Sequence, residues 1–350
     1  MTPSPTITRT ARTATLVAPR ELEVLDQPVP AVGDGEVLLD TLYSGISAGT
    51  EMNVYRGSAA LWRTRRDAEN GLFEPTDEPE WTYPMAYGYA AVSRIAEVGA
   101  NVTTVAVGDL VYTYTPHSSA AVVPAATVVV LPTLLDPRIG VLNANLNTAY
   151  NGILDAHPNF GDVVVVSGLG VIGLIQVQIL HRLGVRVIGI DGVPERRALA
   201  ERFGAEITLE PGSHVAREVR KLTNNRGADI VIEVSGASAA LNEAIRIVGY
   251  NGAVIAMSWY GGTFENLSLI GEFHHNRPRI ISSQVGGLSP TLGSLWSLER
   301  RQEVVLQLMQ QLDLEPLLTH ERSIEDAAEA YRIVDSRPDD LVQFVLAYHS

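Results

Sequence analysis

Apolar runs and amphipathic segments alternate along the chain from about residue 140 onward. The apolar runs are rich in Val and Ile and have the length of buried strands, whereas the segments between them have the spacing of helices. The strand candidates are residues 162–168, 185–191, 228–236, 252–258 and 279–287, and the helix candidates are residues 171–184, 194–205 and 237–252. This alternation predicts a parallel sheet with helices on both faces, and it excludes all-α and all-β folds.

The rest of the chain has a different pattern. Residues 11–131 contain short apolar stretches separated by Gly, Pro and Asn turn signals, which predicts a β-rich region. Residues 297–314 and 323–338 have helical spacing, and residues 341–348 form a last strand candidate. Since single cores stop growing near about 250–300 residues, a chain of 350 residues is expected to form two domains.

A glycine-rich turn separates the first buried strand from its helix. Gly168, Gly170 and Gly173 match G-x-G-x-x-G in the context that this pattern requires. In that context the first glycine permits a tight turn, the second lets the backbone approach a pyrophosphate, and the third lets helix and strand pack closely. The helix N-terminus adds free N–H groups that favour phosphate. We therefore predict that a dinucleotide contacts the whole turn: Gly168, Leu169, Gly170, Val171, Ile172 and Gly173.

Asp191 ends the second strand of this alternating region. A carboxylate at that position accepts the ribose hydroxyls of NAD and repels the 2′-phosphate of NADP. We therefore predict NAD as the cofactor, with Gly192 and Arg196 beside it. Arg196 can lie against the adenine ring, although Arg196 and Arg197 are also able to face a phosphate. The alternative interpretation is an ordinary glycine turn beside a capped strand end.

Composition excludes several classes of partner and of site. The 40 acidic and 26 basic residues give a net charge of −14, which argues against nucleic acid. No apolar run reaches about 18 residues, so we expect no membrane span, and the absence of an N-terminal apolar region predicts a cytoplasmic protein. The chain has no cysteine, which removes disulfides, thiolate nucleophiles and Cys-ligated zinc.

Several segments together resemble the medium-chain dehydrogenase/reductase superfamily. Residues 44–57, SGISAGTEMNVYRG, resemble its G-I-C-G-T-D segment with one extra residue, and residues 83–113 resemble its P-x-x-x-G-H-E and V-G-D-x-V segments. Residues 146–153 and the C-terminal residues 325–346 also match. The G-I-S-x-G-T-E form is similar to the branch that contains bacteriochlorophyllide dehydrogenase and sugar or polyol dehydrogenases.

This resemblance implies an α/β protein with a GroES-like β-rich catalytic domain and a Rossmann domain with a doubly wound parallel sheet. The implied boundaries are 1–139 for the first part of the catalytic domain, 140–288 for the NAD-binding domain and 289–350 for the return to the catalytic domain. A homodimer is implied, with a tetramer as the alternative. By position, the resemblance adds these cofactor contacts: Thr148, Val234, Met257, Ser258, Ser283, Gln284 and Val285.

The same resemblance locates the positions where relatives hold catalytic zinc. Those positions are Ser47 or Ala48, Tyr89-Ala90 and Ala144. Serine, tyrosine and alanine are not the thiolate, imidazole and carboxylate ligands that zinc prefers. We therefore predict no metal. The remaining alternative is a zinc site built from His117 and carboxylates; the adjacent His274-His275 are interpreted as a polar loop pair.

Without zinc, another group has to handle the proton of the reacting oxygen. Tyr89 occupies the position of the lost His ligand and can exchange a proton. Glu51 replaces the Asp that lies behind the zinc ligands in relatives and is a candidate base, while Thr50 stands where zinc enzymes have a relay hydroxyl. The candidates for orienting a substrate oxygen are Ser47, Asn147 and Asn143, the last two spaced to share a helix face. For each residue the alternative is a satisfied buried hydrogen-bonding group.

Residues 55–83 form a long, mixed segment that includes Trp62, and its family position is near the mouth of the active-site cleft between the domains. We interpret it as a substrate lid, because long irregular insertions are often functional, with a solvated surface excursion as the alternative.

Taken together, the sequence predicts a zinc-independent NAD(H) oxidoreductase that transfers hydride between nicotinamide and a secondary alcohol or ketone of a small-molecule substrate such as a sugar, a cyclitol or a complex metabolite. Three alternatives stay open at this point. They are a quinone or enoyl reductase acting on C=C bonds, a redox-neutral epimerase or lyase with tightly held NAD, and a non-catalytic NAD-binding protein.

Overall fold

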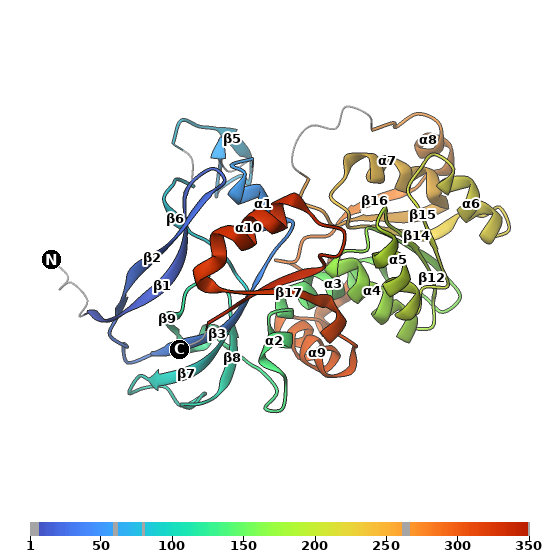
Figure 1. Cartoon of the computed structure of the whole chain (residues 1–350). Coiled ribbons are helices and arrows are strands. Elements are labelled where there is room, and N and C mark those ends of the chain that lie inside the picture. Colours follow the sequence, from blue (N-terminus) through green and yellow to red (C-terminus); the bar gives the residue numbers. More distant parts are fainter. Residues whose placement is uncertain (1–6, 59–61, 79–80, 261–266, 349–350) are drawn as a thin grey trace. The chain divides into compact units, whose positions relative to one another are not determined.

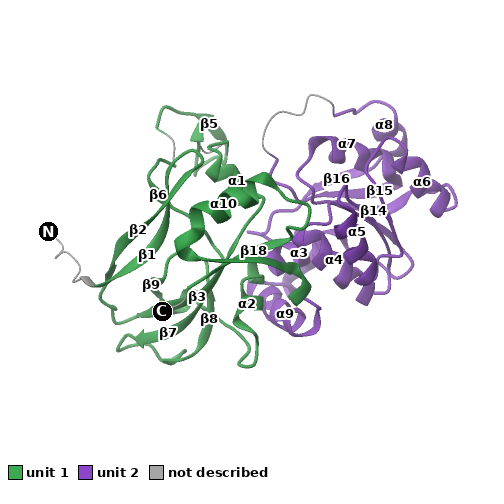
Figure 2. Ribbon diagram, in the orientation of Figure 1, with its two compact units in different colours: residues 1–144, 315–350 green, residues 145–314 purple. Residues whose placement is uncertain are grey.

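The structure is a computed structural model that describes residues 7–58, 62–78, 81–260 and 267–348 (Figure 1). The chain forms two compact units, shown in different colours in Figure 2. Unit 1 consists of residues 1–144 and 315–350, and unit 2 consists of residues 145–314.

Unit 1 is built from β-sheets. One three-stranded sheet has the order β2 (Glu21–Pro30), β1 (Ile7–Ala18) and β6 (Met85–Ala86). A seven-stranded sheet runs in the order β10 (Val129–Val130), β8 (Leu110–Thr113), β7 (Ala91–Val98), β3 (Glu36–Ile46), β18 (Gln343–Ala347) and β17 (Leu318–Ser323), with β9 (Ala120–Pro124) paired to β3. A small hairpin joins β4 (Thr64–Arg66) to β5 (Phe73–Pro75). The β-rich character predicted for the first part of the chain is confirmed.

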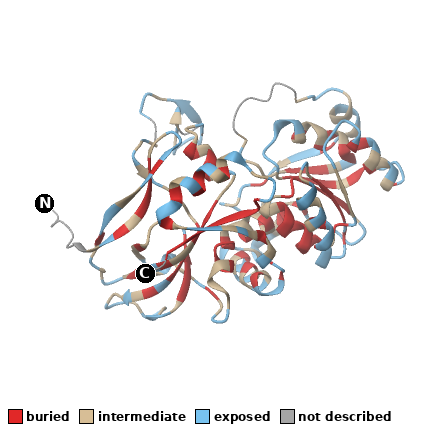
Figure 3. Ribbon diagram, in the orientation of Figure 1, coloured by how far each residue is buried: buried red, intermediate tan, exposed pale blue. Residues whose placement is uncertain are grey.

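The C-terminal strand completes the large sheet of unit 1. β18 pairs antiparallel with β3, with Phe344 opposite Ile46, and parallel with β17. Phe344 and Ile46 are each 1% exposed and share a core with Leu16 and Met52. Figure 3 colours the ribbon by burial, with buried residues in red. Full burial of such side chains stabilises a fold by about 1.5–3 kcal/mol each. The C-terminal strand therefore contributes directly to the hydrophobic core formed by the N-terminal part of unit 1.

Three α-helices accompany these sheets: α1 (Thr50–Tyr55), α2 (Pro137–Gly140) and α10 (Ala327–Ser336). The predicted helix over 323–338 begins as a 3-10 turn, Ile324–Asp326, before α10. α1 packs against α10, and the rings of Tyr55 and Tyr331 lie 5.3 Å apart. This packing fixes the short α1, which carries Thr50 and Glu51.

Unit 2 contains the predicted parallel sheet. Its order is β13 (Ile207–Leu209), β12 (Arg186–Ile190), β11 (Val163–Ser167), β14 (Ala228–Glu233), β15 (Val248–Ala256) and β16 (Arg279–Ser282). All neighbouring pairs are parallel. In order of sequence this is 3-2-1-4-5-6, the doubly wound arrangement of the Rossmann fold. Each residue of β11 is buried, as expected for a strand covered on both faces.

The helices of this region are α3 (Asn143–Ala156), α4 (Val171–Arg182), α5 (Pro194–Arg202), α6 (Val215–Leu222), α7 (Ser238–Ile247), α8 (Glu272–Asn276) and α9 (Leu298–Gln311). α7 ends at Ile247, five residues earlier than the sequence suggested, because Val248 already begins β15. Among the helices of residues 7–58, 62–78, 81–260 and 267–348, none is long and apolar enough to cross a membrane.

The compact units divide at residues 144 and 314, whereas the sequence suggested 139 and 288. The difference at the second boundary is due to α9, which is tied to unit 2 by hydrogen bonds. Arg301 of α9 donates to Asn151 Oδ1 at 2.6 Å, and the backbone N–H of Asp313 donates to Gln178 Oε1 at 2.8 Å. The chain therefore returns to unit 1 only at Glu315.

Candidate active site and cofactor site

The glycine-rich turn at the carboxyl end of β11 contains three glycines, and a different structural constraint applies at each position. Gly168 has φ +102°, a conformation that other residues rarely adopt. A Cβ on Gly173 would lie 1.9 Å from the carbonyl oxygen of Gly168, so the helix could not approach the turn. A Cβ on Gly170 would meet no atom within 4 Å. Packing within the protein therefore accounts for Gly168 and Gly173, while Gly170 borders open space.

Asp191 connects the end of β12 to this turn. Its Oδ2 accepts from the backbone N–H of Leu169 at 2.7 Å, and its Oδ1 accepts from the N–H of Val193 at 2.9 Å. Each carboxylate oxygen keeps a further lone pair, so both can still accept hydroxyl donors. Arg197 is not available for a phosphate through Nη1, which donates to the Asp191 carbonyl at 2.7 Å. Of the other residues predicted here, Gly192 follows Asp191 directly and Arg196 lies in the first turn of α5.

The remaining predicted cofactor contacts follow the carboxyl ends of neighbouring strands. Val234 follows β14, Met257 and Ser258 follow β15, and Ser283–Val285 follow β16. Thr148 lies on α3 and is half-buried. The ends of parallel neighbours share one sheet edge, so these positions lie along the same edge as the glycine-rich turn. In doubly wound sheets this edge is where ligands bind.

A buried carboxylate at this edge was missed by sequence reasoning. Glu233 ends β14 with no exposed surface, and it accepts from the backbone N–H of Ser235 at 2.8 Å and from Ser258 Oγ at 3.1 Å. The hydroxyl of Tyr260 also donates to Glu233, and burial together with this carboxylate raises the Tyr260 pKa. Glu233 thus fastens the loops after β14 and β15 to each other. The only sequence signal was one acid at the end of an apolar run.

In unit 1, Tyr89 is held between two hydroxyl side chains. Its phenol lies near the side chains of Ser47 and Thr50, which act to lower its pKa, and its backbone carbonyl accepts from Tyr112 Oη at 2.5 Å. Burial raises the Tyr89 pKa, and the nearby negative charge of Glu51 raises it further, while the bonds from Ser47 and Thr50 act in the opposite direction. Three of the predicted catalytic residues therefore meet at one phenol oxygen.

Glu51, predicted as a candidate base, is an anchor in the structure. It has no exposed surface. Its Oε2 lies 2.9 Å from His117 Nε2 and accepts from Tyr331 Oη at 2.6 Å, and its Oε1 accepts from the N–H of Ser47 at 2.9 Å. Both carboxylate oxygens are engaged within unit 1. Glu51 acts on Tyr89 through its charge and by holding Ser47.

His117 continues this buried network. Its Nδ1 lies 2.7 Å from Ser44 Oγ, which lies 2.8 Å from Tyr348 Oη. His117 therefore faces one carboxylate, Glu51, which is fewer ligands than a zinc ion needs. Within residues 7–58, 62–78, 81–260 and 267–348, no three His, Asp or Glu side chains are grouped so that they could hold a metal. The donors present, including Ser47 and Tyr89, do not fit zinc.

Asn147 and Asn143, predicted to orient a substrate oxygen, lie one turn apart on α3 and are both buried. Asn147 Oδ1 accepts from Arg301 Nε at 3.2 Å, and its Nδ2 donates to Gln302 Oε1 at 2.9 Å. These bonds tie the amide of Asn147 to α9. They correspond to the alternative interpretation of Asn147 as a satisfied buried group.

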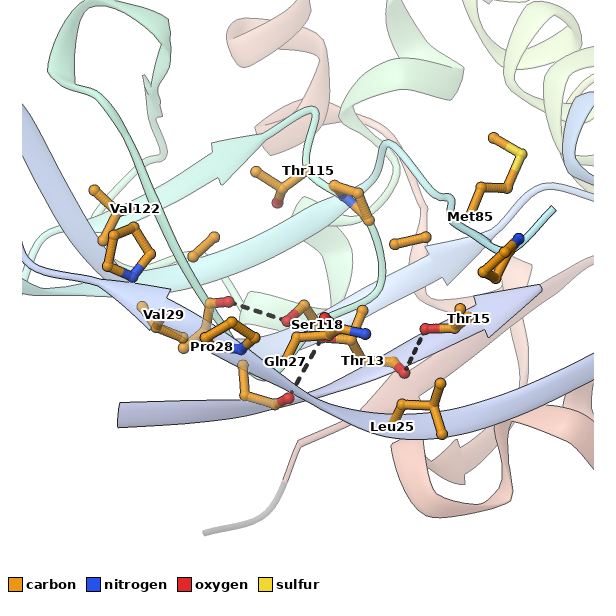
Figure 4. Close-up of a pocket in the computed structure, with 17 residues that line it drawn as sticks. Thr13, Thr15, Leu25, Gln27, Pro28, Val29, Met85, Thr115, Ser118 and Val122 are labelled. Carbon is orange, nitrogen blue, oxygen red and sulfur yellow. Dashed lines mark hydrogen bonds between the residues drawn. The ribbon is translucent and has the colours of Figure 1, made fainter. Parts of the chain in front are cut away.

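Two surface pockets are present in the part of the chain that the structure describes, and both lie away from the predicted catalytic and cofactor-binding residues. The one in Figure 4, about 450 Å³, is lined by β1, β2, β9 and the residues 115–118 that precede β9, and in it Thr13 Oγ1 lies 2.8 Å from Ser118 Oγ. The other, about 770 Å³, opens at the amino ends of β14 and β15 and includes Asp229 and Arg279. Neither contains a predicted catalytic or cofactor residue, so neither supports the assigned site.

The segment interpreted as a lid, residues 55–83, contains the β4–β5 hairpin and a group of aromatic rings. Trp62 stacks on Tyr83 with ring centroids 4.3 Å apart. Residues 59–61 and 79–80 of this segment lie outside the described residues.

A 3-2-1-4-5-6 parallel sheet with a glycine-rich turn at its carboxyl edge, together with a GroES-like β unit, defines a dinucleotide-dependent oxidoreductase. The chain is similar to the medium-chain dehydrogenase/reductase superfamily over nearly its whole length. A family model described as zinc-binding dehydrogenase matches residues 171–299. D-guloside 3-dehydrogenase of Escherichia coli K12 is 29% identical over 343 residues, which cover 95% of this chain and 98% of that protein.

Solved structures show the same fold. An alcohol dehydrogenase of Escherichia coli CFT073 complexed with NADH has a TM-score of 0.78 at 19% identity, covering 97% of this chain and 100% of that one. A zinc-binding dehydrogenase of Sinorhizobium meliloti 1021 bound to NADP has a TM-score of 0.77 at 18% identity, with the same coverage.

Proposed function

We propose that this protein is a zinc-independent, NAD(H)-dependent oxidoreductase that interconverts a secondary alcohol and a ketone on a sugar or related small molecule. The observation that carries the proposal is the phenol of Tyr89 beside the side chains of Ser47 and Thr50, with Tyr89 and Ser47 at two of the positions that the family resemblance assigns to zinc ligands. A sugar-type substrate is supported by the similar protein named D-guloside 3-dehydrogenase.

The cofactor part of the proposal rests on unit 2. Gly170 leaves room for a pyrophosphate, and the carboxylate of Asp191 offers acceptors for ribose hydroxyls. Proteins with this fold are bound to NADH or to NADP. The negative charge of Asp191 favours NAD, because it would repel a 2′-phosphate. The bound nicotinamide would supply the hydride donor and acceptor.

Tyr89 supplies the proton in the proposed reaction. Because its pKa is raised, the phenol stays protonated at neutral pH and can donate to the oxygen of a ketone during reduction. Hydrogen bonds from Ser47 and Thr50 then stabilise the phenolate that remains. In the oxidation direction the deprotonated form of Tyr89, whose population grows as the pH rises toward its raised pKa, accepts the proton of the substrate hydroxyl.

The proposal includes a homodimer. β16 is an edge strand of the parallel sheet, and Ile280 on it is 37% exposed. The unpaired backbone groups of such an edge are able to pair with a second copy.

The test follows NADH formation from NAD⁺ with a panel of sugars, glycosides and polyols, before and after exhaustive chelation. We expect turnover that chelation leaves unchanged, and Tyr89→Phe should lower kcat by about 10²–10⁴-fold without changing NADH affinity. Loss of activity on chelation would refute the zinc-free assignment. A Tyr89→Phe enzyme with full turnover would refute the role of Tyr89. Purification with tightly bound NAD and no net NADH release would favour a redox-neutral reaction instead.

A further inference from the structure

A continuous row of aromatic rings begins at Tyr89. Neighbouring rings are in contact at centroid distances of 6.5 Å for Tyr89–Tyr87, 5.5 Å for Tyr87–Trp81, 6.0 Å for Trp81–Trp62 and 4.3 Å for Trp62–Tyr83. All five residues belong to unit 1, and each is neither fully buried nor fully exposed. We call Tyr89, Tyr87, Trp81, Trp62 and Tyr83 the aromatic row.

The aromatic row is supported from behind. Four of its members, all except Tyr89, pack against the core that contains Met52 and Tyr331. The hydroxyl of Tyr83 donates to the carbonyl of Val54 on α1 at 2.9 Å, so the outer end of the row is anchored to the helix that carries Thr50. The row is therefore a supported surface that leads away from the proposed proton donor.

One polar atom in the row has no use within the protein. The indole Nε1 of Trp62 is buried and has no hydrogen-bond partner in the part of the chain that the structure describes. An indole N–H is a donor only, and a buried donor without an acceptor is unfavourable.

We propose that the aromatic row binds the substrate of the reaction, and that this substrate is an uncharged pyranoside. This inference rests on the proposed function, since it assigns the substrate class of the same site. The faces of aromatic rings carry partial negative charge, so the C–H groups on one face of a pyranose ring pack well against them. An open-chain polyol has no flat face and loses more conformational freedom on binding.

Electrostatics at the Tyr89 end of the row disfavour an anionic group at the reacting end of the substrate. The negative charge of Glu51 acts on both Tyr87 and Tyr89. Burial is the main cause that raises the pKa of Tyr87 to about 12, and the charge of Glu51 adds to it. The phenols near the reacting end thus stay neutral, with a buried carboxylate behind them. A sugar phosphate would have to approach against this charge, whereas a neutral glycoside would not.

Steady-state kinetics with saturating NAD⁺ test the substrate class. The probes are methyl pyranosides of common hexoses, the corresponding open-chain hexitols, and hexose phosphates. We expect kcat/KM for at least one methyl pyranoside to exceed that for every hexitol and hexose phosphate tenfold or more. Equal or better turnover of hexitols or hexose phosphates would overturn the inference while leaving the proposed oxidoreductase in place. The absence of NADH formation with all probes would instead refute the proposed function and this inference together.

Variants test the row itself. Trp62→Ala and Trp81→Ala should each raise KM for the pyranoside at least tenfold, keep kcat within threefold and leave NADH affinity unchanged, and the Phe substitutions should restore most of the loss. Trp296→Phe, a matched change in unit 2, should alter nothing. Pyranoside addition should change tryptophan emission in the wild type and in Trp296→Phe, but not in a Trp62→Phe/Trp81→Phe double variant. An unchanged KM in both alanine variants, or an emission change that persists in the double variant, would overturn the assignment.

Discussion

Oε2 of Glu51 lies 2.9 Å from Nε2 of His117, and neither side chain has any exposed surface. This pair connects α1, which carries the hydroxyl of Thr50, to the loop before β9. A buried carboxylate is stable only when its oxygens are hydrogen-bonded, and here Tyr331 and the backbone of Ser47 supply the remaining donors. The site around Tyr89 therefore depends on a carboxylate that a substrate need not touch.

The first prediction concerns stability. Glu51→Ala should lower the free energy of unfolding of unit 1 by about 3 kcal/mol, because it leaves three buried donors without an acceptor. Urea unfolding followed by circular dichroism and tryptophan fluorescence measures the loss. The control is Glu325→Gln, which removes an exposed ion pair with Arg12 in the same unit and should have a far smaller effect. Equal losses in the two variants would contradict the anchoring role of Glu51.

The second prediction concerns pH dependence. The Tyr89 pKa is raised by burial and by the charge of Glu51, so Glu51→Gln should lower it. Ketone reduction needs the protonated phenol, which is present below this pKa and lost above it. The alkaline limb of kcat/KM for reduction by NADH should thus move to lower pH in Glu51→Gln. In the Tyr89→Phe variant, adding Glu51→Gln should leave the alkaline limb of kcat/KM at the same pH. A shift of the limb in this double variant would show that a group other than Tyr89 titrates there.

The third prediction separates folding from cofactor binding at the glycine-rich turn. Gly170 has φ −73°, and a methyl group added there would meet no protein atom within 4 Å, so Gly170→Ala should keep the thermal midpoint of the wild type. This methyl group should weaken NADH binding by about tenfold, or about 1.4 kcal/mol, because it occupies the space left for pyrophosphate. Gly173→Ala should instead destabilise unit 2, because its Cβ would clash with the carbonyl of Gly168. Thermal melts and NADH fluorescence titrations measure both effects.

The fourth prediction concerns cofactor choice. Asp191→Asn keeps an oxygen for the N–H groups of Leu169 or Val193 but removes the charge that repels a 2′-phosphate. We expect the ratio of kcat/KM for NAD over NADP to fall by about tenfold or more, with little change in the thermal midpoint. An unchanged ratio would show that Asp191 serves the turn and does not select the cofactor.

The sequence predicted the parallel sheet because its local signals agree with its tertiary environment. Val163–Val166 are buried on both faces, and a continuous run of valines is typical of such a strand. The end of α7 could not be placed in the same way. Gly249 and Gly252 resemble turn residues in the sequence, whereas in the structure they lie within β15 and allow close contact with the backbone around Ala228.

At the candidate site, sequence reasoning brought together residues that are close along the chain. Ser47 and Thr50 are three residues apart, and the resemblance to known dehydrogenases added Tyr89. The partners of Glu51 were not predictable, since His117 and Tyr331 are 66 and 280 residues away. Such a network is a property of the assembled sheet and helices, and no spacing pattern encodes it.

The position of β18 has a consequence for the synthesis of the protein. Because β18 lies between β3 and β17, unit 1 lacks an internal strand of its main sheet until Gln343–Ala347 have left the ribosome. Unit 2, residues 145–314, is contiguous and emerges complete before that point. The nascent chain is thus expected to form its nucleotide-binding unit first. Until β18 is synthesised, β3 in the first 144 residues lacks its partner strand on one side. The proposed catalytic hydroxyls in unit 1 would then reach their final arrangement after the nucleotide-binding unit has formed.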